Sequence, residues 1–298
     1  MNTRNITVCI CTYKRPEYLK QLLNRLLSQV TGNRFHYSIT IADNDREQTA
    51  VNIVSEFIGY SPVPILYCVE PEQNISLARN KAIKNSTGDF IAFIDDDEIP
   101  DENWLLRLFQ TCEKYDTDGV LGPVKPYFEC EPPRWIKKGK YFERPSHKTG
   151  HILHWSETRT GNVLFKKEIV AELNEPFNPA FGTGSEDVDF FQRMITQGYV
   201  FVWDDEATIY EIIPPVRYQK RYQLRLALLR GGNSFKHRTS WKKNLLKSMV
   251  AFPIYSLILP FLFLMGEHHF MNYLIRLGDH TGRILAFAGF HPIKKREL

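Results

Sequence analysis

Three consecutive carboxylates, Asp95, Asp96 and Asp97, directly follow an apolar segment at residues 90–94. An apolar run of this length favours a buried strand, and ligands of parallel sheets bind beyond the carboxyl ends of the strands. Adjacent like charges repel one another, so we expect a counter-charge here. Carboxylate oxygens suit Mg²⁺ or Mn²⁺, and a divalent cation that carries a phosphate would supply that charge. A solvated acidic turn is the simpler alternative.

Three further polar clusters lie where predicted strands end or helices begin. Residues 12–15 follow the first predicted strand, residues 43–45 follow the second, and residues 74–80 open a helix after the third. Carboxyl ends of parallel strands form the ligand-binding edge of a sheet, so we expect these clusters to share one site with the carboxylates. Each cluster also has a structural interpretation, as a helix cap, a turn or a surface side chain.

Apolar periodicity predicts an α/β fold for the first hundred residues. Strands alternate with helices there, which implies a mostly parallel sheet with right-handed crossovers. The expected strands cover residues 6–11, 37–42, 64–69 and 90–94, and the expected helices cover 16–27, 51–57 and 75–85. Farther on, we expect helices at 104–115 and 188–197, extended segments at 121–129, 152–165 and 199–203, and a loop at 132–149 that could order over a ligand.

The C-terminal part is basic and then apolar. No Asp or Glu lies between Glu211 and Glu267, an interval that carries ten Lys and Arg residues, so we expect an anionic partner. Residues 248–266 are uncharged and approach the length of about 20 residues that a membrane span needs. Because Pro253 and Pro260 interrupt this segment, we predict a helix hairpin or an interfacial segment in the cytoplasmic leaflet. A buried helix pair at a dimer interface is the alternative.

Composition excludes several other classes. With 298 residues, 43% of them hydrophobic and 24% charged, the chain can bury a substantial core. Five scattered cysteines without a CxxC pair indicate a reduced, cytoplasmic setting, and the N-terminus shows no signal peptide. A GxxxxGK[ST] loop is absent, which argues against ATP hydrolysis of that type. None of the nine histidines forms an HExxH pattern or a similar pair with a carboxylate at zinc spacing.

In combination, these motifs resemble those of the family 2 inverting glycosyltransferases. The resemblance covers about residues 5–235 and implies a GT-A nucleotide-diphospho-sugar transferase fold, which is Rossmann-like with a mostly parallel central sheet. Its motifs are Cys11-Thr-Tyr-Lys-Arg-Pro16, Ile41-Ala-Asp-Asn-Asp45, Ser76-Leu-Ala-Arg-Asn80, Phe93-Ile-Asp-Asp-Asp-Glu98, Thr160-Gly-Asn-Val-Leu-Phe165 and Gly184-Ser-Glu-Asp-Val-Asp-Phe190. On this basis residues 1–100 would bind the nucleotide-sugar, residues 101–215 would form the acceptor-binding and catalytic half of the same domain, and residues 216–298 would form a helical membrane-associating region.

The resemblance also implies a role for each site residue. On the donor side these are Thr12, Tyr13 and Arg15 for the nucleotide-sugar, Asp43 or Asn44 for the nucleobase, Arg79 for the nucleotide, Asp95 or Asp96 for ribose or sugar hydroxyls, and Asp97 for Mn²⁺ or Mg²⁺. On the acceptor side, Asp187 would be the catalytic base, and Glu186 and Trp155 would bind the acceptor.

Inverting displacement requires a group that takes the proton of the acceptor hydroxyl, and a carboxylate such as Asp187 can do so. The alternative is that Glu186 and Asp187 only cap the helix that follows them.

Two positions depart from the family pattern. Gln219-Lys-Arg-Tyr222 stands where processive members carry Gln-x-x-Arg-Trp, which argues against processive polymerisation. Tyr210-Glu211 stands where many relatives place a histidine, which puts a histidine metal ligand in doubt.

We therefore predict a non-processive transferase that moves a sugar from a UDP-sugar to a hydroxyl of a growing or polyprenyl-diphosphate-linked glycan. It would act in surface polysaccharide synthesis at the cytoplasmic face of the bacterial inner membrane, with no nucleic-acid partner. One alternative is a sugar-phosphate nucleotidyltransferase, which would need a glycine-rich loop that residues 11–16 lack. The other is a non-catalytic membrane scaffold.

Overall fold

The computed structural model describes residues 3–234 and 241–293, so Lys236 and Arg238 of the basic interval lie outside the described residues. The chain divides into two compact units. The first unit comprises Met1–Pro126, Arg144–Gly182 and Glu186–Ile212, and the second comprises Tyr127–Glu143, Thr183–Ser185 and Ile213–Leu298. The expected boundaries after residues 100 and 215, and the roles expected for each region, stay predictions.

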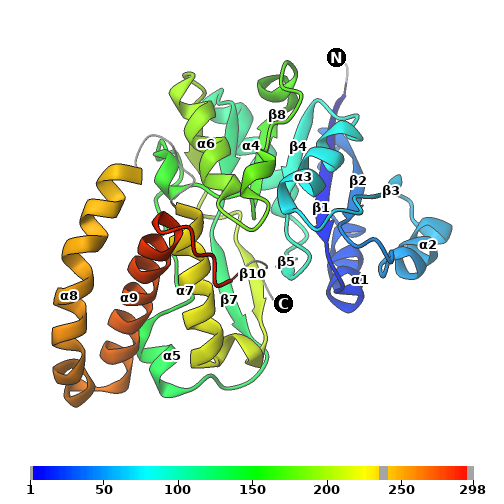
Figure 1. The fold of residues 1–298 in the computed structure, drawn as a ribbon. Coiled ribbons are helices and arrows are strands. Elements are labelled where there is room, and N and C mark those ends of the chain that lie inside the picture. Colours follow the sequence, from blue (N-terminus) through cyan, green and yellow to red (C-terminus); the bar gives the residue numbers. More distant parts are fainter. Residues whose placement is uncertain (1–2, 235–240, 294–298) are drawn as a thin grey trace. The chain divides into compact units, whose positions relative to one another are not determined.

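A seven-stranded sheet forms the centre of the first unit (Figure 1). Its strands are β1 (Arg4–Thr12), β2 (Phe35–Asp43), β3 (Ile65–Val69), β4 (Phe90–Phe93), β6 (Gly119–Leu121), β8 (Val163–Lys166) and β9 (Phe201–Trp203). They lie in the order β3-β2-β1-β4-β8-β6-β9. All neighbours run parallel except β8, which is antiparallel to both β4 and β6. The prediction of a mostly parallel α/β sheet is confirmed.

Helices of the first unit cover both faces of this sheet. They are α1 (Pro16–Leu26), α2 (Val51–Tyr60), α3 (Ile75–Lys84), α4 (Trp104–Tyr115) and α6 (Glu186–Thr196), with the 3₁₀ turns η1 (Trp155–Glu157), η2 (Lys167–Val170) and η3 (Pro179–Phe181). One apolar core lies under α1, α2 and α4, and the other lies under α3 and α6. In α1, Leu19, Leu22, Leu23 and Leu26 are all buried, as their helical spacing requires.

A second, three-stranded sheet has the order β5 (Glu98–Pro100), β10 (Ile209–Ile213) and β7 (Val124–Phe128). Strands β5 and β10 are antiparallel, and their register sets Glu98 directly opposite Glu211. The turn that carries the three aspartates therefore continues into β5, whose Glu98 lies opposite the Glu211 carboxylate of β10.

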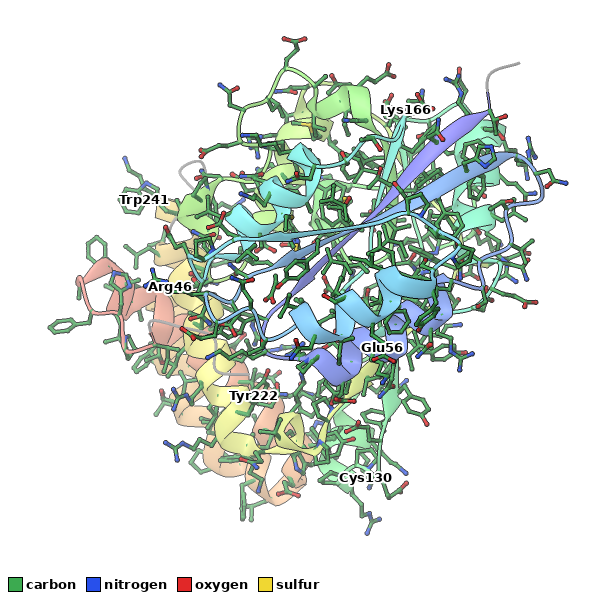
Figure 2. All side chains as sticks on the ribbon, turned by 90° about the vertical axis from the view of Figure 1, so that its right-hand side faces the viewer. Arg46, Glu56, Cys130, Lys166, Tyr222 and Trp241 are labelled. Atoms are coloured by element: carbon green, nitrogen blue, oxygen red, sulfur yellow. The ribbon has the colours of Figure 1, made fainter. Side chains whose placement is uncertain are left out.

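The carboxyl ends of the parallel strands β1, β2 and β4 lie at one edge of the sheet in the first unit. Arg46 follows the carboxyl end of β2 and is exposed, whereas Lys166 pairs with Phe90 at the start of β4 (Figure 2). The two side chains thus mark opposite ends of the sheet. All the predicted donor-side clusters lie at the end that Arg46 marks.

Two predicted segments fold differently from the expectation. The loop predicted at residues 132–149 contains α5 (Arg134–Gly139), which buries Trp135. The segment predicted as strand-rich, 152–165, forms a strand only from Val163, because His154 starts a turn instead. The amide of His154 donates to the Glu157 carboxylate at 2.9 Å, and its ring accepts from the amide of Ser156. Such a capping box favours a helical turn over an extended chain.

The second unit is helical and has its own small core. Its helices are α5, α7 (Lys220–Ser234), α8 (Trp241–Met265) and α9 (Glu267–Phe287), with the 3₁₀ turn η4 (Pro215–Tyr218). Helix α9 packs against both α7 and α8 (Figure 1). A Cβ atom at Gly231 would lie 2.1 Å from the Asp279 carbonyl oxygen, and one at Gly282 would lie 2.2 Å from that of Leu228. The two glycines therefore permit the close approach of α7 and α9.

Helix α8 is continuous through Pro253 and Pro260, so the predicted interruption at these prolines is wrong. A proline removes one backbone donor and kinks a helix, but the remaining bonds of a 25-residue helix persist. The hairpin forms between α8 and α9 instead, with the turn at Gly266, whose φ is +131°. By length and composition α8 could cross a membrane. Of its apolar 18-residue stretch, 6% is buried within the protein.

Candidate active site

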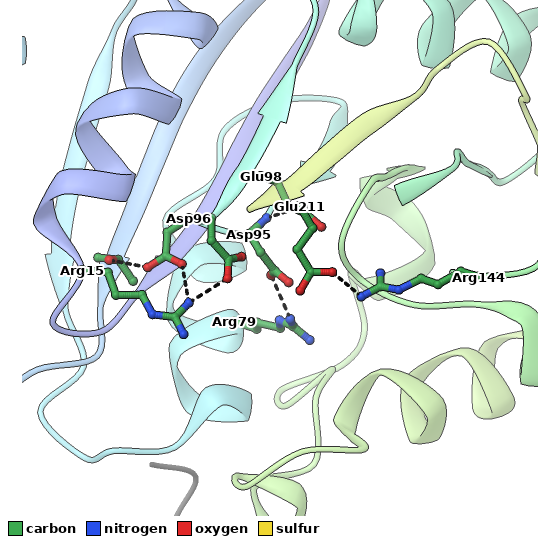
Figure 3. Close-up of polar contacts among 9 residues, drawn as sticks. Arg15, Arg79, Asp95, Asp96, Glu98, Arg144 and Glu211 are labelled. Carbon is green, nitrogen blue, oxygen red and sulfur yellow. Dashed lines mark hydrogen bonds and ion pairs between the residues drawn. The ribbon is translucent and has the colours of Figure 1, made fainter. Parts of the chain in front are cut away.

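Two of the three aspartates are buried and share one arginine. Nη1 of Arg15 lies 3.2 Å from Oδ1 of Asp96 and 3.0 Å from Oδ2 of Asp97 (Figure 3). The hydroxyl of Thr12 donates to Oδ2 of Asp96 at 2.8 Å. Thr12 ends β1 and Arg15 precedes α1, so the structure joins the first polar cluster to the aspartates, as predicted. The counter-charge that we assigned to a cation alone is thus supplied in part by Arg15.

Burial raises the pKa of Asp96 to about 7, with Arg15 opposing this shift and Asp97 adding to it. Because the folded pKa lies above the unfolded value of about 4, the folded state binds the proton more tightly between these values. The stability that Asp96 contributes is therefore fully present below about pH 4 and is lost as the pH rises through about 7.

We expect Asp96→Asn to flatten the fall in melting temperature between about pH 5 and about pH 8, because the titrating group is gone. At about pH 8 the variant should melt above the wild-type protein. Thermal unfolding followed by circular dichroism at both pH values measures this. Asp116→Asn is the matched control, because the Asp116 side chain is fully exposed. An equal pH slope in the wild type and Asp96→Asn would contradict the assignment.

Arg79 connects the aspartates to the start of α6. Its helix, α3, is capped at the N-terminus by Asn74, whose side chain accepts the amides of Ser76 and Leu77. Arg79 is 5% exposed, so the surface interpretation of this residue is wrong. Its Nη2 lies 3.3 Å from Oδ1 of Asp95, and its Nη1 pairs with Oε1 of Glu186. One guanidinium thus holds together two motifs that lie far apart in the sequence.

We expect Arg79→Met to lower the free energy of unfolding by about 3–5 kcal/mol, because it leaves the buried Glu186 without its positive partner. Denaturant unfolding measures this loss. The control is Arg107→Met, which removes a surface pair with Asp101 and should cost less than about 1 kcal/mol. A loss for Arg79→Met as small as that of the control would show that the pair does not stabilise the fold.

The first two residues of α6 have different environments. Glu186 is buried and Asp187 is half-buried. Burial raises the pKa of Glu186 to about 7, against the opposing charge of Arg79. Oδ1 of Asp187 accepts the amide of Val188 at 2.8 Å. Within residues 3–234 and 241–293, Oε2 of Glu186 is buried and has no hydrogen-bond partner. Capping of α6 alone does not explain this unpaired oxygen.

The side chains predicted to bind the nucleobase, Asp43 and Asn44, already form several hydrogen bonds within the protein. The Asp43 carboxylate accepts the amides of Asp45 and Ala50 and the hydroxyl of Tyr67. The Asn44 side chain donates to the carbonyl oxygens of Glu70 and Glu72 and accepts the amide of Asn74. Both side chains thus shape the loops at the ends of β2 and β3.

Asp45 is a candidate that the sequence reasoning did not single out. It is buried, and its Oδ2 has no hydrogen-bond partner among the described residues. Because an unpaired buried carboxylate oxygen is costly, this atom is a candidate ligand contact. The sequence feature that could have identified Asp45 as a site residue is its position as the last acidic residue of the Asp43-Asn44-Asp45 run.

Glu98, Glu211 and Arg144 extend the polar network beyond the predicted residues (Figure 3). Oε2 of Glu98 accepts the amide of Asp95 at 2.8 Å, and burial raises the pKa of Glu98 well above its ordinary value. Nη2 of Arg144 lies 2.5 Å from Oε2 of Glu211. The position where many relatives carry a histidine therefore holds a carboxylate that is paired with an arginine.

Arg159, also not predicted, lies in the electrostatic field of the same network. Burial lowers the pKa of Arg159 to about 10, Arg144 adds to the shift, and Asp187 opposes it. In the described part of the chain, by contrast, neither Tyr13 nor Trp155 makes a polar contact with the three aspartates. Tyr13 is half-buried at the end of β1, and Trp155 packs against the core under α6.

The family model described as glycosyl transferase family 2 matches residues 7–171, which is more than half of the chain. The chain belongs to the family 2 glycosyltransferases. The matched segment of this glycosyltransferase contains the three aspartates and Arg79 and ends before α6. Membership of this family favours a glycosyltransferase over the two alternatives, a sugar-phosphate nucleotidyltransferase and a non-catalytic membrane scaffold.

Individual relatives agree with this assignment. The succinoglycan biosynthesis protein ExoM of Rhizobium meliloti is 36% identical over 219 residues, which cover 72% of this chain and 69% of that protein. Among solved structures, S. aureus TarS 1–349 in complex with UDP-GlcNAc aligns with a TM-score of 0.55 at 14% identity, covering 97% of this chain and 93% of that one. GalNAc-T7 with UDP, GalNAc and Mn²⁺ aligns with a TM-score of 0.54 at 14% identity, covering 74% and 46%. At such identities the structures show the fold alone, and the predicted GT-A fold is confirmed.

Proposed function

We propose that this glycosyltransferase transfers a single sugar, with inversion, from a UDP-sugar to a hydroxyl of a lipid-linked or growing glycan in bacterial surface polysaccharide synthesis. The observation that carries the proposal is the double pairing of Arg79 with Asp95 and Glu186. It holds the donor-side carboxylates and the helix that begins with Glu186-Asp187 at one site. The role of the relative ExoM in succinoglycan biosynthesis supports a polysaccharide product, and the complex of TarS with UDP-GlcNAc supports a UDP-sugar donor.

On the donor side, Thr12, Tyr13 and Arg15 would bind the nucleotide-sugar together with Arg79. Asp43 and Asn44 would shape the nucleobase pocket, and Asp95 or Asp96 would accept ribose or sugar hydroxyls. Asp97 would hold Mn²⁺ or Mg²⁺, since carboxylate oxygens are the ligands that these ions prefer. When bound, that ion supplies Lewis-acid stabilisation of the charge on the departing diphosphate.

On the acceptor side, Oδ2 of Asp187 would take the proton of the acceptor hydroxyl as the new glycosidic bond forms. Glu186 is bound to Arg79 and is therefore better suited to orient the acceptor through its remaining oxygen, Oε2. Trp155 would offer its ring to the apolar face of a sugar.

A panel of UDP-, GDP-, dTDP- and CMP-sugars tests the proposal directly. We expect Mn²⁺-dependent binding and slow hydrolysis of one UDP-sugar, with a released sugar of inverted anomeric configuration by NMR. If the folded protein bound no nucleotide-sugar, the hypothesis of a non-catalytic membrane scaffold would replace that of a transferase. If it instead formed pyrophosphate from a sugar phosphate and a nucleoside triphosphate, it would be a nucleotidyltransferase.

Helix α8 is the proposed membrane contact, at the cytoplasmic face of the inner membrane. Its apolar side chains are largely exposed, including Leu257 at 74% and Leu264 at 83%. Lys242, Lys243 and Lys247 lie near its N-terminal end. An apolar helix with a basic end matches an anionic lipid surface, where polyprenyl-linked acceptors also reside.

We expect Leu257→Glu together with Leu264→Glu to weaken binding to vesicles that contain anionic lipid by about 100-fold or more, because each leucine loses at least ~1.5 kcal/mol of burial. Vesicle co-sedimentation measures this. Ile58→Glu is the control, because Ile58 is a half-exposed apolar residue on α2. If the double variant bound vesicles normally but changed from dimer to monomer in gel filtration, α8 would be a dimer interface.

A further inference from the structure

His147, His151 and Glu157 gather at one point of the first unit, although no HExxH-type spacing marks them in the sequence. One ligand atom from each lies within 4.8 Å of the other two. Nε2 of His147 lies 3.3 Å from Oε1 of Glu157, and Nε2 of His151 lies 3.6 Å from Oε2 of the same carboxylate. We propose that these three side chains bind a zinc-class divalent cation, at a site whose residues are all different from the catalytic ones.

The separations fit a shared metal better than a close ion pair. Charge-assisted N–H···O bonds are typically about 2.7–2.9 Å long, shorter than either distance here. In a tetrahedral zinc site with metal–ligand bonds of about 2.0–2.1 Å, two ligand atoms lie roughly 3.4 Å apart. The observed 3.3 Å and 3.6 Å are close to that value, and they join the two imidazoles to different oxygens of the same carboxylate. One ligand atom from each residue lies within 4.8 Å of the other two, so rotations of the side chains would be needed to close the site around a cation.

The loop that carries the two histidines is anchored along its length. The Gly150 amide donates to the Trp203 carbonyl oxygen at 2.8 Å, and the Trp203 amide donates to that of His151 at 2.9 Å. The hydroxyl of Ser146 donates to Asp205 at 2.7 Å. The His147 ring also packs edge-on against Trp203, with ring centroids 5.5 Å apart. The ligands are thus positioned before any metal binds, which favours affinity.

The type of ligand selects the class of metal. Two imidazoles and one carboxylate suit Zn²⁺ and similar transition metals, whereas Mg²⁺ prefers oxygen ligands alone. With three protein ligands, a fourth position remains for water or another ligand.

Metal binding would also stabilise the turn η1. Glu157 closes that turn by accepting the His154 amide, and Trp155 stands between them. Turn η1 contacts α6, the helix that begins with Glu186 and Asp187. The consequence for acceptor binding rests on the proposed role of Trp155, whereas the metal site itself does not.

Zinc titration of the full-length, metal-free protein tests the site, with calorimetry for stoichiometry and a chromophoric chelator as competitor for affinity. We expect one tight equivalent of Zn²⁺ in the wild type and in Asp97→Asn, and a higher melting temperature with Zn²⁺. The double variant His147→Ala, His151→Ala should bind about 100-fold more weakly or worse, since loss of even an outer contact costs 10–100-fold. His36→Ala, an exposed histidine on β2, should bind as the wild type does.

Three results would overturn the proposal. The wild type could bind no stoichiometric Zn²⁺, the double variant could bind it as tightly as the wild type, or Asp97→Asn could lose it, which would place the ion at the aspartates. If the double variant does not fold, as judged by circular dichroism, Glu157→Gln takes its place. That substitution keeps the shape of the side chain and removes its charge, and unchanged affinity there would equally count against the site.

Discussion

Asp187→Asn should lower kcat by about 10²–10⁴-fold and leave the affinity for the UDP-sugar unchanged. The amide of asparagine can still accept the Val188 amide, which Oδ1 of Asp187 accepts at 2.8 Å, so the start of α6 should persist. It cannot take a proton from the acceptor hydroxyl. The loss therefore falls on the chemical step, and single-turnover kinetics with saturating donor measures it.

The matched control is Asp189→Asn, two residues farther along the same helix. Asp189 pairs with Arg193 at 2.9 Å, so its role is to stabilise α6. This variant should keep kcat within a few-fold of the wild type. Wild-type turnover by Asp187→Asn would reject Asp187 as the base. Equal losses in both variants would indicate a general weakening of α6 instead.

Asp97→Asn should weaken Mn²⁺-dependent binding of the UDP-sugar by about 100-fold or more, because a direct ligand is expected to matter at least as much as an outer contact. The variant also reduces the negative charge that Arg15 neutralises, since Nη1 of Arg15 lies 3.0 Å from Oδ2 of Asp97. Binding should therefore become nearly independent of Mn²⁺. Calorimetry with and without Mn²⁺ separates the metal-dependent part from the rest.

Asp101→Asn provides the control for Asp97. Asp101 lies four residues farther on, is half-exposed, and pairs with Arg107 on the surface. We expect it to show wild-type Mn²⁺ dependence. If Asp97→Asn kept the full metal-dependent affinity, the cation would be held by other residues, and Asp95 and Asp96 would be the next to test.

The roles assigned to Asp97 and Asp187 can be tested separately because the two residues would act in different steps of the reaction. Asp97 affects the binding of the donor with its metal, whereas Asp187 affects proton transfer from the acceptor. Loss of Arg79 should affect both, since its guanidinium pairs with Asp95 and with Glu186. This linkage is the structural reason to treat the two halves as one active site.

Local sequence patterns determined the fold of the first hundred residues and the family. Strands and helices there follow from apolar periods of two and 3.6 residues, which depend on neighbours in the sequence. The ligand-facing edge also followed, because parallel strands bring their carboxyl ends together. Thus Thr12, Arg15 and Asp96 could be placed together from the sequence, although 84 residues separate Thr12 from Asp96.

Only the tertiary structure decided which polar atoms are already used and which remain available. Asp43 and Asn44 match the expected motif, yet their side chains are bound within the protein, whereas Asp45 keeps an oxygen without a partner in the described residues. The pairing of Arg79 with Glu186 and the gathering of His147, His151 and Glu157 likewise have no periodic signature. Such pairings depend on how distant segments pack and on which charges burial forces together, and neither is encoded in the spacing of residues along the chain.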